Sequence, residues 1–329
     1  MSKDTVTKSN PDGIEEDHRF AADESWLTRL VQLRVFGKSP LNAFMRLNQK
    51  FWRKLPGSVT ALYPVRKYGE ILHALARMQG YRGQLHHTFF LRNRPMLELM
   101  RRLVERINSR GELRVAVLGC STGPEAYSVA WAIRSARPNL KLILHAVDIS
   151  ERAVKIGEDG LYSVVDSQLA GSNIFDRVTE AEMQELFDKK GDVFVIKSQL
   201  KEGMRWQVAD VGEPRILSAL GPQDIVVANN FLCHMDTPAA ERCLRNIANL
   251  VVPRGYLFVS GVDLNIRAKV AKELEWQPVQ ELLEEIHDGD PRMGNGWPFN
   301  YSSLEPFDKR KQDWRLRYAA VYQLDSSNK

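Results

Sequence analysis

The sequence predicts an α/β fold in which helices cover both faces of a parallel sheet, with a small helical domain before it. After Gly111, apolar strand-like segments alternate with helix-like segments. The strand-like segments are almost continuously apolar, which is typical of parallel strands buried on both faces. With 329 residues, 43% of them hydrophobic, the chain can form one large domain and a smaller one.

The predicted elements follow the chain in order. Apolar residues recur at helical spacing from residue 26 to about 84, and a linker helix is expected over 86–107. Strands are expected over 114–118, 142–148, 206–210, 224–229, 256–261 and 317–324. Helices are expected over 124–134, 151–158, 180–188 and 238–250. Pro124 and Pro238 suit first-turn positions, where proline is well tolerated.

These elements divide the chain into four parts. Residues 1–24 are polar and lack apolar periodicity, so we expect a disordered tail. A basic helical domain is expected over 25–85, a linker helix over 86–110, and the α/β domain over 111–329. The α/β domain ends in an aromatic-rich extension that is expected to form a lid, to form a pocket wall or to cover the sheet edge.

Charge and cysteine content narrow the class of protein. The stretch from Trp26 to Arg106 contains sixteen Lys and Arg residues and only three acidic residues, although the net charge of the whole chain is only +5. This basic stretch is expected either to be a solvated face or to dock on an acidic protein helix, a nucleic acid or a membrane surface. We expect no signal peptide and no membrane span, because the first residues are polar and no apolar run approaches about 20 residues. Three cysteines without metal-type spacing indicate a reduced, cytoplasmic protein without a structural metal.

The segment Leu113–Ser128, an apolar strand followed by a glycine-bounded turn and a helix, is compatible with two chemistries. Gly119, Ser121 and Gly123 fit the turn that exposes a nucleophilic serine in α/β-hydrolases, and Asp148 with His234 would complete a triad in the required order. Such hydrolases place strands upstream of this turn, whereas the upstream residues here are helical and basic. The hydrolase is therefore the least favoured alternative.

The same turn can hold a cofactor. Gly119 and Gly123 permit positive φ and a close approach to the backbone. Asp148, at the end of the next strand, is suited to bind both ribose hydroxyls. Glu125 lies in the first helical turn, where it would repel the phosphates of a dinucleotide but attract an ammonium or sulfonium group. This favours S-adenosylmethionine over NAD.

Several motifs then resemble one family in the same order: GCSTGPEAYS, AVDIS, GLYS, DIVVANNFLCHMD and GYLFVSG, preceded by Thr88-Phe89-Phe90-Leu91-Arg92. Residues 88–261 are similar to the CheR-type chemotaxis receptor methyltransferases. The resemblance implies a class I methyltransferase, Rossmann-like sheet, mostly parallel with its last strand antiparallel, after an N-terminal helical domain. It also implies that residues 111–329 bind S-adenosylmethionine and release S-adenosylhomocysteine.

The resemblance also implies roles for particular residues. Thr88 and Arg92 would reach the cofactor, with Arg92 near its methionyl carboxylate or its methyl group. The turn would contact the cofactor through its backbone, Glu125 would meet its amino group, and Asn229 and Asn230 would lie beneath its methionine part. The cofactor-binding residues implied are Thr88, Arg92, Gly119, Ser121, Thr122, Gly123, Glu125, Asp148, Ile149, Asp210, Val211, Asn229 and Asn230. Asp148 and Ile149 would hold the ribose, and Asp210 and Val211 would face the adenine.

The acceptor side departs from the family pattern. The family's arginine is replaced by Asn229 and its tyrosine by His234, which puts methylation of a receptor glutamate in doubt. A carboxylate acceptor would need only a positioning cation such as Arg92, whereas a hydroxyl or amine would need a base, for which His234 is the candidate. Arg92 and His234 are the catalytic candidates, and no metal is expected.

The function expected is therefore S-adenosylmethionine-dependent methyl transfer to a protein carboxylate or to another O or N acceptor. A small-molecule O- or N-methyltransferase and a non-catalytic S-adenosylmethionine-binding module remain as alternatives. The partner expected is an acidic protein or a small-molecule acceptor, and nucleic acid is not favoured.

Overall fold

A computed structural model describes residues 40–79, 88–107, 111–163, 173–290 and 296–325. The predicted tail over 1–24 lies outside these ranges. The chain forms two compact units, residues 1–54 and 55–329, and each is considered by itself. Within the described ranges, no helix is both long enough and apolar enough to cross a membrane.

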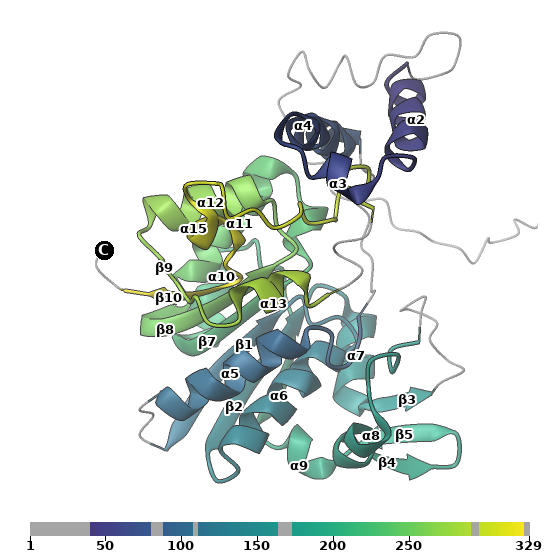
Figure 1. The fold of residues 1–329 in the computed structure, drawn as a ribbon. Helices are drawn as coiled ribbons and strands as arrows, with labels where there is room; N and C mark the ends of the chain where they lie inside the picture. The colour runs from purple at the N-terminus through teal and green to yellow at the C-terminus, as the bar shows by residue number, and fades with distance from the viewer. Residues whose placement is uncertain (1–39, 80–87, 108–110, 164–172, 291–295, 326–329) are drawn as a thin grey trace, which may run out of the picture. The chain divides into compact units, whose positions relative to one another are not determined.

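The second unit is organised around one large sheet (Figure 1). Its strands, in spatial order, are β6 (Met204–Val208), β2 (Lys141–Asp148), β1 (Glu112–Leu118), β7 (Gln223–Asn229), β8 (Val251–Ser260), β10 (Val321–Leu324) and β9 (Gln277–Pro278). The first five pair in parallel, and β10 runs antiparallel to both β8 and β9. This confirms the expected mostly parallel sheet with an antiparallel last strand.

Helices cover both faces of this sheet, as expected from its apolar strands (Figure 1). One face packs against α5 (Arg94–Arg106), α6 (Pro124–Ala136) and α13 (Leu283–Asp288). The other packs against α10 (Arg215–Leu220), α11 (Thr237–Ala248), α12 (Leu264–Glu273) and α15 (Trp314–Tyr318). Within β1, Val115 and Val117 join the first apolar cluster, whereas Ala116 and Leu118 join the second. The strand therefore needs apolar residues on both sides.

A small antiparallel sheet lies between the second and sixth strands of the chain, and the sequence did not predict it. It consists of β3 (Leu161–Ser163), β5 (Val193–Ile196) and β4 (Phe187–Lys190), and follows α7 (Glu151–Asp159). The helices α8 (Glu180–Leu186) and α9 (Ser198–Lys201) flank the pair β4 and β5. The helix predicted over 180–188 therefore ends early, because Phe187 already begins β4 and is buried among aromatic rings.

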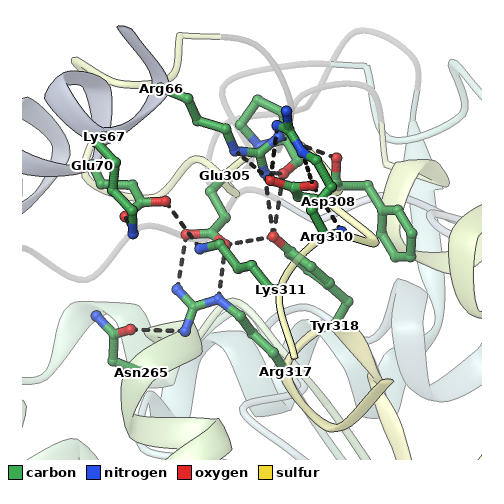
Figure 2. A network of polar contacts seen from close by, with 12 residues as sticks. Arg66, Lys67, Glu70, Asn265, Glu305, Asp308, Arg310, Lys311, Arg317 and Tyr318 are labelled. Atoms are coloured by element: carbon green, nitrogen blue, oxygen red, sulfur yellow. Dashed lines mark hydrogen bonds and ion pairs between the residues drawn. The ribbon is translucent and has the colours of Figure 1, made fainter. Parts of the chain in front are cut away.

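The helical part before the sheet contains α2 (Pro40–Trp52) in the first unit, and α3 (Gly57–Thr60) and α4 (Tyr63–Gln79) in the second. Ion pairs join α4 to the segment that follows α13 (Figure 2). Arg66 lies 3.5 Å from Asp308, and Lys311 Nζ lies 3.0 Å from Glu70 and 2.8 Å from Glu305. Most of these side chains are largely buried, so the C-terminal segment is a fixed neighbour of α4.

Two predicted boundaries were wrong. The linker helix was expected from residue 86, but α5 begins at Arg94, because the Asn93 side chain caps it and Pro95 occupies its first turn. The last strand was expected from Arg317, but α15 continues to Tyr318 and β10 begins only at Val321.

Candidate active site

The topology places a crevice at the carboxyl ends of β1 and β7. The chain runs from β1 outward through β2 to β6 and then returns to β7 on the other side of β1. Ligands of open α/β sheets bind where the strand order reverses in this way. Here, Asn229 at the end of β7 donates through Nδ2 to Glu125 Oε1 of α6, at 2.7 Å. The two strands thus bring residues over one hundred positions apart into one site.

The turn between β1 and α6 has the predicted backbone. Gly119 and Gly123 have φ of 67° and 101°, and Ser121 has φ of 51°. On the side where a Cβ would lie, the space beside both glycines is taken by other parts of the protein. A Cβ on Gly119 would lie 2.7 Å from the Phe231 ring, and one on Gly123 would lie 2.8 Å from Trp206. Both glycines are therefore required for packing as well as for φ.

The turn is fastened to the neighbouring strand by Asp148, the last residue of β2. Its Oδ2 accepts a hydrogen bond from the Ser121 amide (2.7 Å), and its Oδ1 accepts one from the Ser150 amide (2.9 Å). The hydroxyl of Tyr162 donates to the carbonyl of Thr122 at 2.7 Å. The Asp148 carboxylate is largely buried, whereas Ile149 beside it is half exposed.

Glu125 is a partly buried carboxylate whose pKa is shifted. Burial raises its pKa, and the hydrogen bond from Asn229 and the positive charge of Arg92 offset this rise only in part. The Oδ1 atoms of Asn229 and Asn230 are also buried, and neither has a hydrogen-bond partner among the described residues. The site therefore presents one carboxylate and two amide oxygens that can accept hydrogen bonds from a ligand.

Arg92 enters the site from the segment before α5 and is held by two residues that the sequence did not indicate. Its Nε donates to Asp290 Oδ2 at 2.5 Å, and Arg177 Nη2 donates to Asp290 Oδ1 at 2.7 Å. Arg177 also donates to the backbone carbonyl of Arg92. Burial opposes ionisation of Asp290, but the two arginines outweigh it and hold the pKa of Asp290 below its usual range.

Several of these groups line one hollow that is open in part to solvent. Its lining includes four of the predicted cofactor residues, Arg92, Glu125, Asn229 and Asn230, together with Asp290. The other nine lie outside this lining: Thr88, Gly119, Ser121, Thr122, Gly123, Asp148, Ile149, Asp210 and Val211. Buried carboxylate, cation and amide oxygens in one hollow suit a ligand that carries both an ammonium and a carboxylate group.

Asp210 and Val211 are placed differently from the prediction, which had them end the strand. The strand β6 ends at Val208, so both residues lie in the turn that follows. Asp210 is exposed, and its Oδ1 accepts a hydrogen bond from the Gly212 amide. The Val211 side chain belongs to a core apolar cluster, so its backbone rather than its side chain is available to a ligand.

A second hollow lies beyond the end of β8 and includes part of the aromatic-rich extension. Its wall includes Cys233, Trp297 and Tyr301, and Leu304 lines both hollows. The Tyr301 hydroxyl lies 3.3 Å from Nδ1 of the neighbouring His234. His234, the catalytic candidate that does not line the first hollow, therefore lies beside the wall of the second.

The triad expected for a hydrolase does not form. Both Asp148 carboxylate oxygens accept from backbone amides, and the His234 ring faces Tyr301. Cys120 is buried, which raises the pKa of its thiol well above the usual value, so it is a packing residue. In the described part of the chain, no three His, Cys, Asp or Glu side chains come together to hold a metal ion.

Comparison with known proteins identifies the family. A family model described as "CheR methyltransferase, SAM binding domain" matches residues 86–274, more than half of the chain. A Pseudomonas aeruginosa protein named "Probable biofilm formation methyltransferase WspC" is 26% identical over 184 residues, which are 54% of this chain and 42% of that protein. A Listeria innocua "Chemotaxis protein methyltransferase" is 24% identical over 177 residues, 53% of this chain and 63% of that protein. The chain thus matches about half the length of these relatives.

Solved structures give more distant similarities. The N-methyltransferase NodS from Bradyrhizobium japonicum, in complex with S-adenosylhomocysteine, is 14% identical and aligns with a TM-score of 0.33 over 56% of this chain and 76% of that one. Magnesium protoporphyrin IX methyltransferase from Synechocystis, with bound S-adenosylmethionine, is 16% identical, with a TM-score of 0.33 over 65% and 86% of the two chains.

Proposed function

This chain belongs to the CheR methyltransferase family, and from that premise we propose that it transfers the methyl group of S-adenosylmethionine to an acceptor at the carboxyl edge of the sheet. The observation that carries the proposal is the partly buried Glu125–Asn229 pair, which shares one hollow with Arg92. This arrangement offers a negative group and a positive group to the two charged ends of an amino acid.

The chain's own residues fit this cofactor. Glu125 would bind the ammonium group of its methionine part, and Arg92 would bind the carboxylate. The buried Oδ1 atoms of Asn229 and Asn230 would accept hydrogen bonds in the same hollow. Asp148 would hold the ribose while it fastens the turn. When bound, the cofactor supplies a methyl group activated by its sulfonium, because the neutral thioether is a good leaving group.

We assign supporting roles to the other predicted residues. The backbone of Gly119, Ser121, Thr122 and Gly123 would border the cofactor. Thr88 would reach the cofactor from the linker, Ile149 would lie beside the ribose, and Asp210 and Val211 would lie beside the adenine. Residues 111–329 would then be the cofactor-binding domain, with residues 25–85 as a helical domain before it.

The acceptor side supports a hydroxyl or amine acceptor best. The position of the family's arginine is taken by Asn229, whose amide is committed to Glu125. His234 takes the place of the family's tyrosine, and the Tyr301 hydroxyl orients its ring beside the second hollow. A histidine fixed in this way is suited to remove a proton from an acceptor near neutral pH. The chain would accelerate transfer mainly by aligning acceptor and methyl group and by excluding water.

A protein carboxylate is the second candidate acceptor. It is favoured by the names of the relatives, two of which are chemotaxis protein methyltransferases. A carboxylate is already deprotonated at neutral pH, so it would need positioning by a cation such as Arg92 and no base.

Calorimetry with S-adenosylhomocysteine tests cofactor binding. The unmodified chain should bind it, Asp148→Ala should abolish binding, and Ser121→Ala should retain most of it because Ser121 contributes its backbone. Absence of binding by the unmodified chain would overturn the proposal.

Incubation with methyl-labelled S-adenosylmethionine and host extract identifies the acceptor class. Base-labile label in protein would indicate a methyl ester. Base-stable label in protein, or label in small molecules, would support the hydroxyl or amine acceptor.

A further inference from the structure

We propose that Asp290 is a positioning residue which, together with Arg177, holds Arg92 in place to bind the carboxylate end of the cofactor. This inference rests on the proposed function. Asp290 and Arg177 lie outside the sequence motifs that resemble the family. Asp290 also lies beyond the range 86–274 that the family model matches.

Two segments that are distant in the sequence converge on Arg92. Asp290, directly after α13, accepts from Arg92 Nε at 2.5 Å, and Arg177, ahead of α8, donates to the same carboxylate at 2.7 Å. Arg177 also donates to the Arg92 carbonyl, and its guanidinium lies 4.8 Å from the centre of the Phe89 ring. Both the side chain and the backbone of Arg92 are therefore fixed by the same pair of residues.

Arg92 needs such support because of its place in the chain. It lies in the irregular segment before α5, directly after Leu91, which has a φ of 52°. An arginine side chain loses much conformational freedom when it is ordered. A site that orders it before the ligand arrives avoids that loss on binding. Asp290, which lines the same hollow, supplies this order through its hydrogen bond to Arg92 Nε.

Asp290 is itself fixed in position relative to Arg92. Its neighbour Gly289 packs so closely on Asn93 that a Cβ there would lie 2.4 Å from Asn93 Oδ1. Asn93 Nδ2 donates to the Ile286 carbonyl at 2.8 Å. Asn93 follows Arg92 and caps α5, so the contact between the end of α13 and the start of α5 holds Asp290 next to Arg92.

The charges in the hollow support the same role. Asp290 accepts hydrogen bonds from both Arg92 and Arg177, so its single negative charge lies between two positive ones. Removal of Asp290 would leave an excess positive charge in a largely buried place, and the two arginines would repel each other.

The test compares two probes by calorimetry: S-adenosylhomocysteine, and 5′-methylthioadenosine, which lacks the amino-acid end. Asp290→Asn should weaken S-adenosylhomocysteine binding about ten- to a hundredfold, the usual effect of losing a hydrogen bond to a charged group, and leave 5′-methylthioadenosine binding unchanged. Arg177→Gln should show the same selective loss. Asp288→Asn is the matched control, because Asp288 is exposed on α13 and should alter neither affinity.

The other outcomes are distinct. Tighter S-adenosylhomocysteine binding by Asp290→Asn would show that Asp290 competes with the cofactor for Arg92 and would overturn the inference. Equal losses of affinity for both probes would show that Asp290 has a general structural role. Unchanged affinity for both probes would show that it has no role. Either result would also overturn the inference. If the unmodified chain binds neither probe, the proposed function fails instead. Binding of 5′-methylthioadenosine by each variant also shows that the variant is folded.

Discussion

Replacement of Glu305 by glutamine should lower the free energy of unfolding strongly. Glu305 is the centre of the network in Figure 2. Its carboxylate accepts two hydrogen bonds from Arg317, both at 2.8 Å, one from Lys311 at 2.8 Å and one from Tyr318 at 2.7 Å. The side chains of Glu305 and Arg317 are only 8% and 11% exposed. Removing one partner of a buried ion pair costs about 3–5 kcal/mol, because the other charge stays buried without compensation.

Urea unfolding at pH 7, followed by circular dichroism, measures this loss. The control is Glu112→Gln, which removes a carboxylate from a more exposed pair with Lys141 and should change stability little. A loss of less than about 1 kcal/mol for Glu305→Gln, the range of exposed pairs, would refute the reasoning.

The same carboxylate predicts sensitivity to acid. Burial raises the pKa of Glu305, but Arg317, Lys311 and Tyr318 outweigh it and hold that pKa well below its usual range. A carboxyl group with a lowered pKa in the folded state stabilises the fold above its unfolded pKa of about 4.3, and this stability is lost as the pH falls further. The unmodified chain should therefore lose stability below about pH 4, and Glu305→Gln should lose less over the same range.

Three further predictions concern the site itself. Gly119→Ala should lower the melting temperature and weaken cofactor binding, because a Cβ would meet Phe231 at a positive φ; the cost is about 1–3 kcal/mol, and an unchanged melting temperature would contradict it. S-adenosylhomocysteine binding should weaken as the pH falls, because burial raises the pKa of Glu125 and its protonation removes the charge that holds the ammonium group. The pH dependence should vanish in Glu125→Gln, and its persistence there would exclude this cause. His234→Ala should lower methyl-label incorporation about 10²- to 10⁴-fold with unchanged S-adenosylhomocysteine affinity, whereas near-normal incorporation would point to a carboxylate acceptor.

The central strands and the cofactor turn could be predicted because their causes are local. A run of apolar residues forms a strand buried on two faces, and the glycines of the turn permit positive φ, so β1, β2 and β7 appear nearly where expected. Glu125 and Asn229 were predicted separately as cofactor residues. Their direct hydrogen bond follows from the pairing of β1 with β7, which no local pattern contains.

The missed features depend on distant partners. Arg92 and Asp290 are 198 positions apart, so no spacing rule connects them. The last two residues of α15, Arg317 and Tyr318, were taken for the start of the strand that follows, yet Arg317 there turns toward Glu305. The small sheet escaped notice because Asp188, Lys189 and Lys190 in β4 are exposed and polar, unlike a buried strand.

The two hydrogen bonds to Asp148 have a consequence for how a ligand is received. The amides of Ser121 and Ser150 bind its carboxylate, and the Tyr162 hydroxyl donates to the Thr122 carbonyl. The protein's own hydrogen bonds thus order the turn, so a ligand need not order it, which lowers the entropic cost of binding. A turn that is ordered before binding cannot adapt its shape to the ligand. A cofactor analogue altered at the ribose should therefore bind poorly.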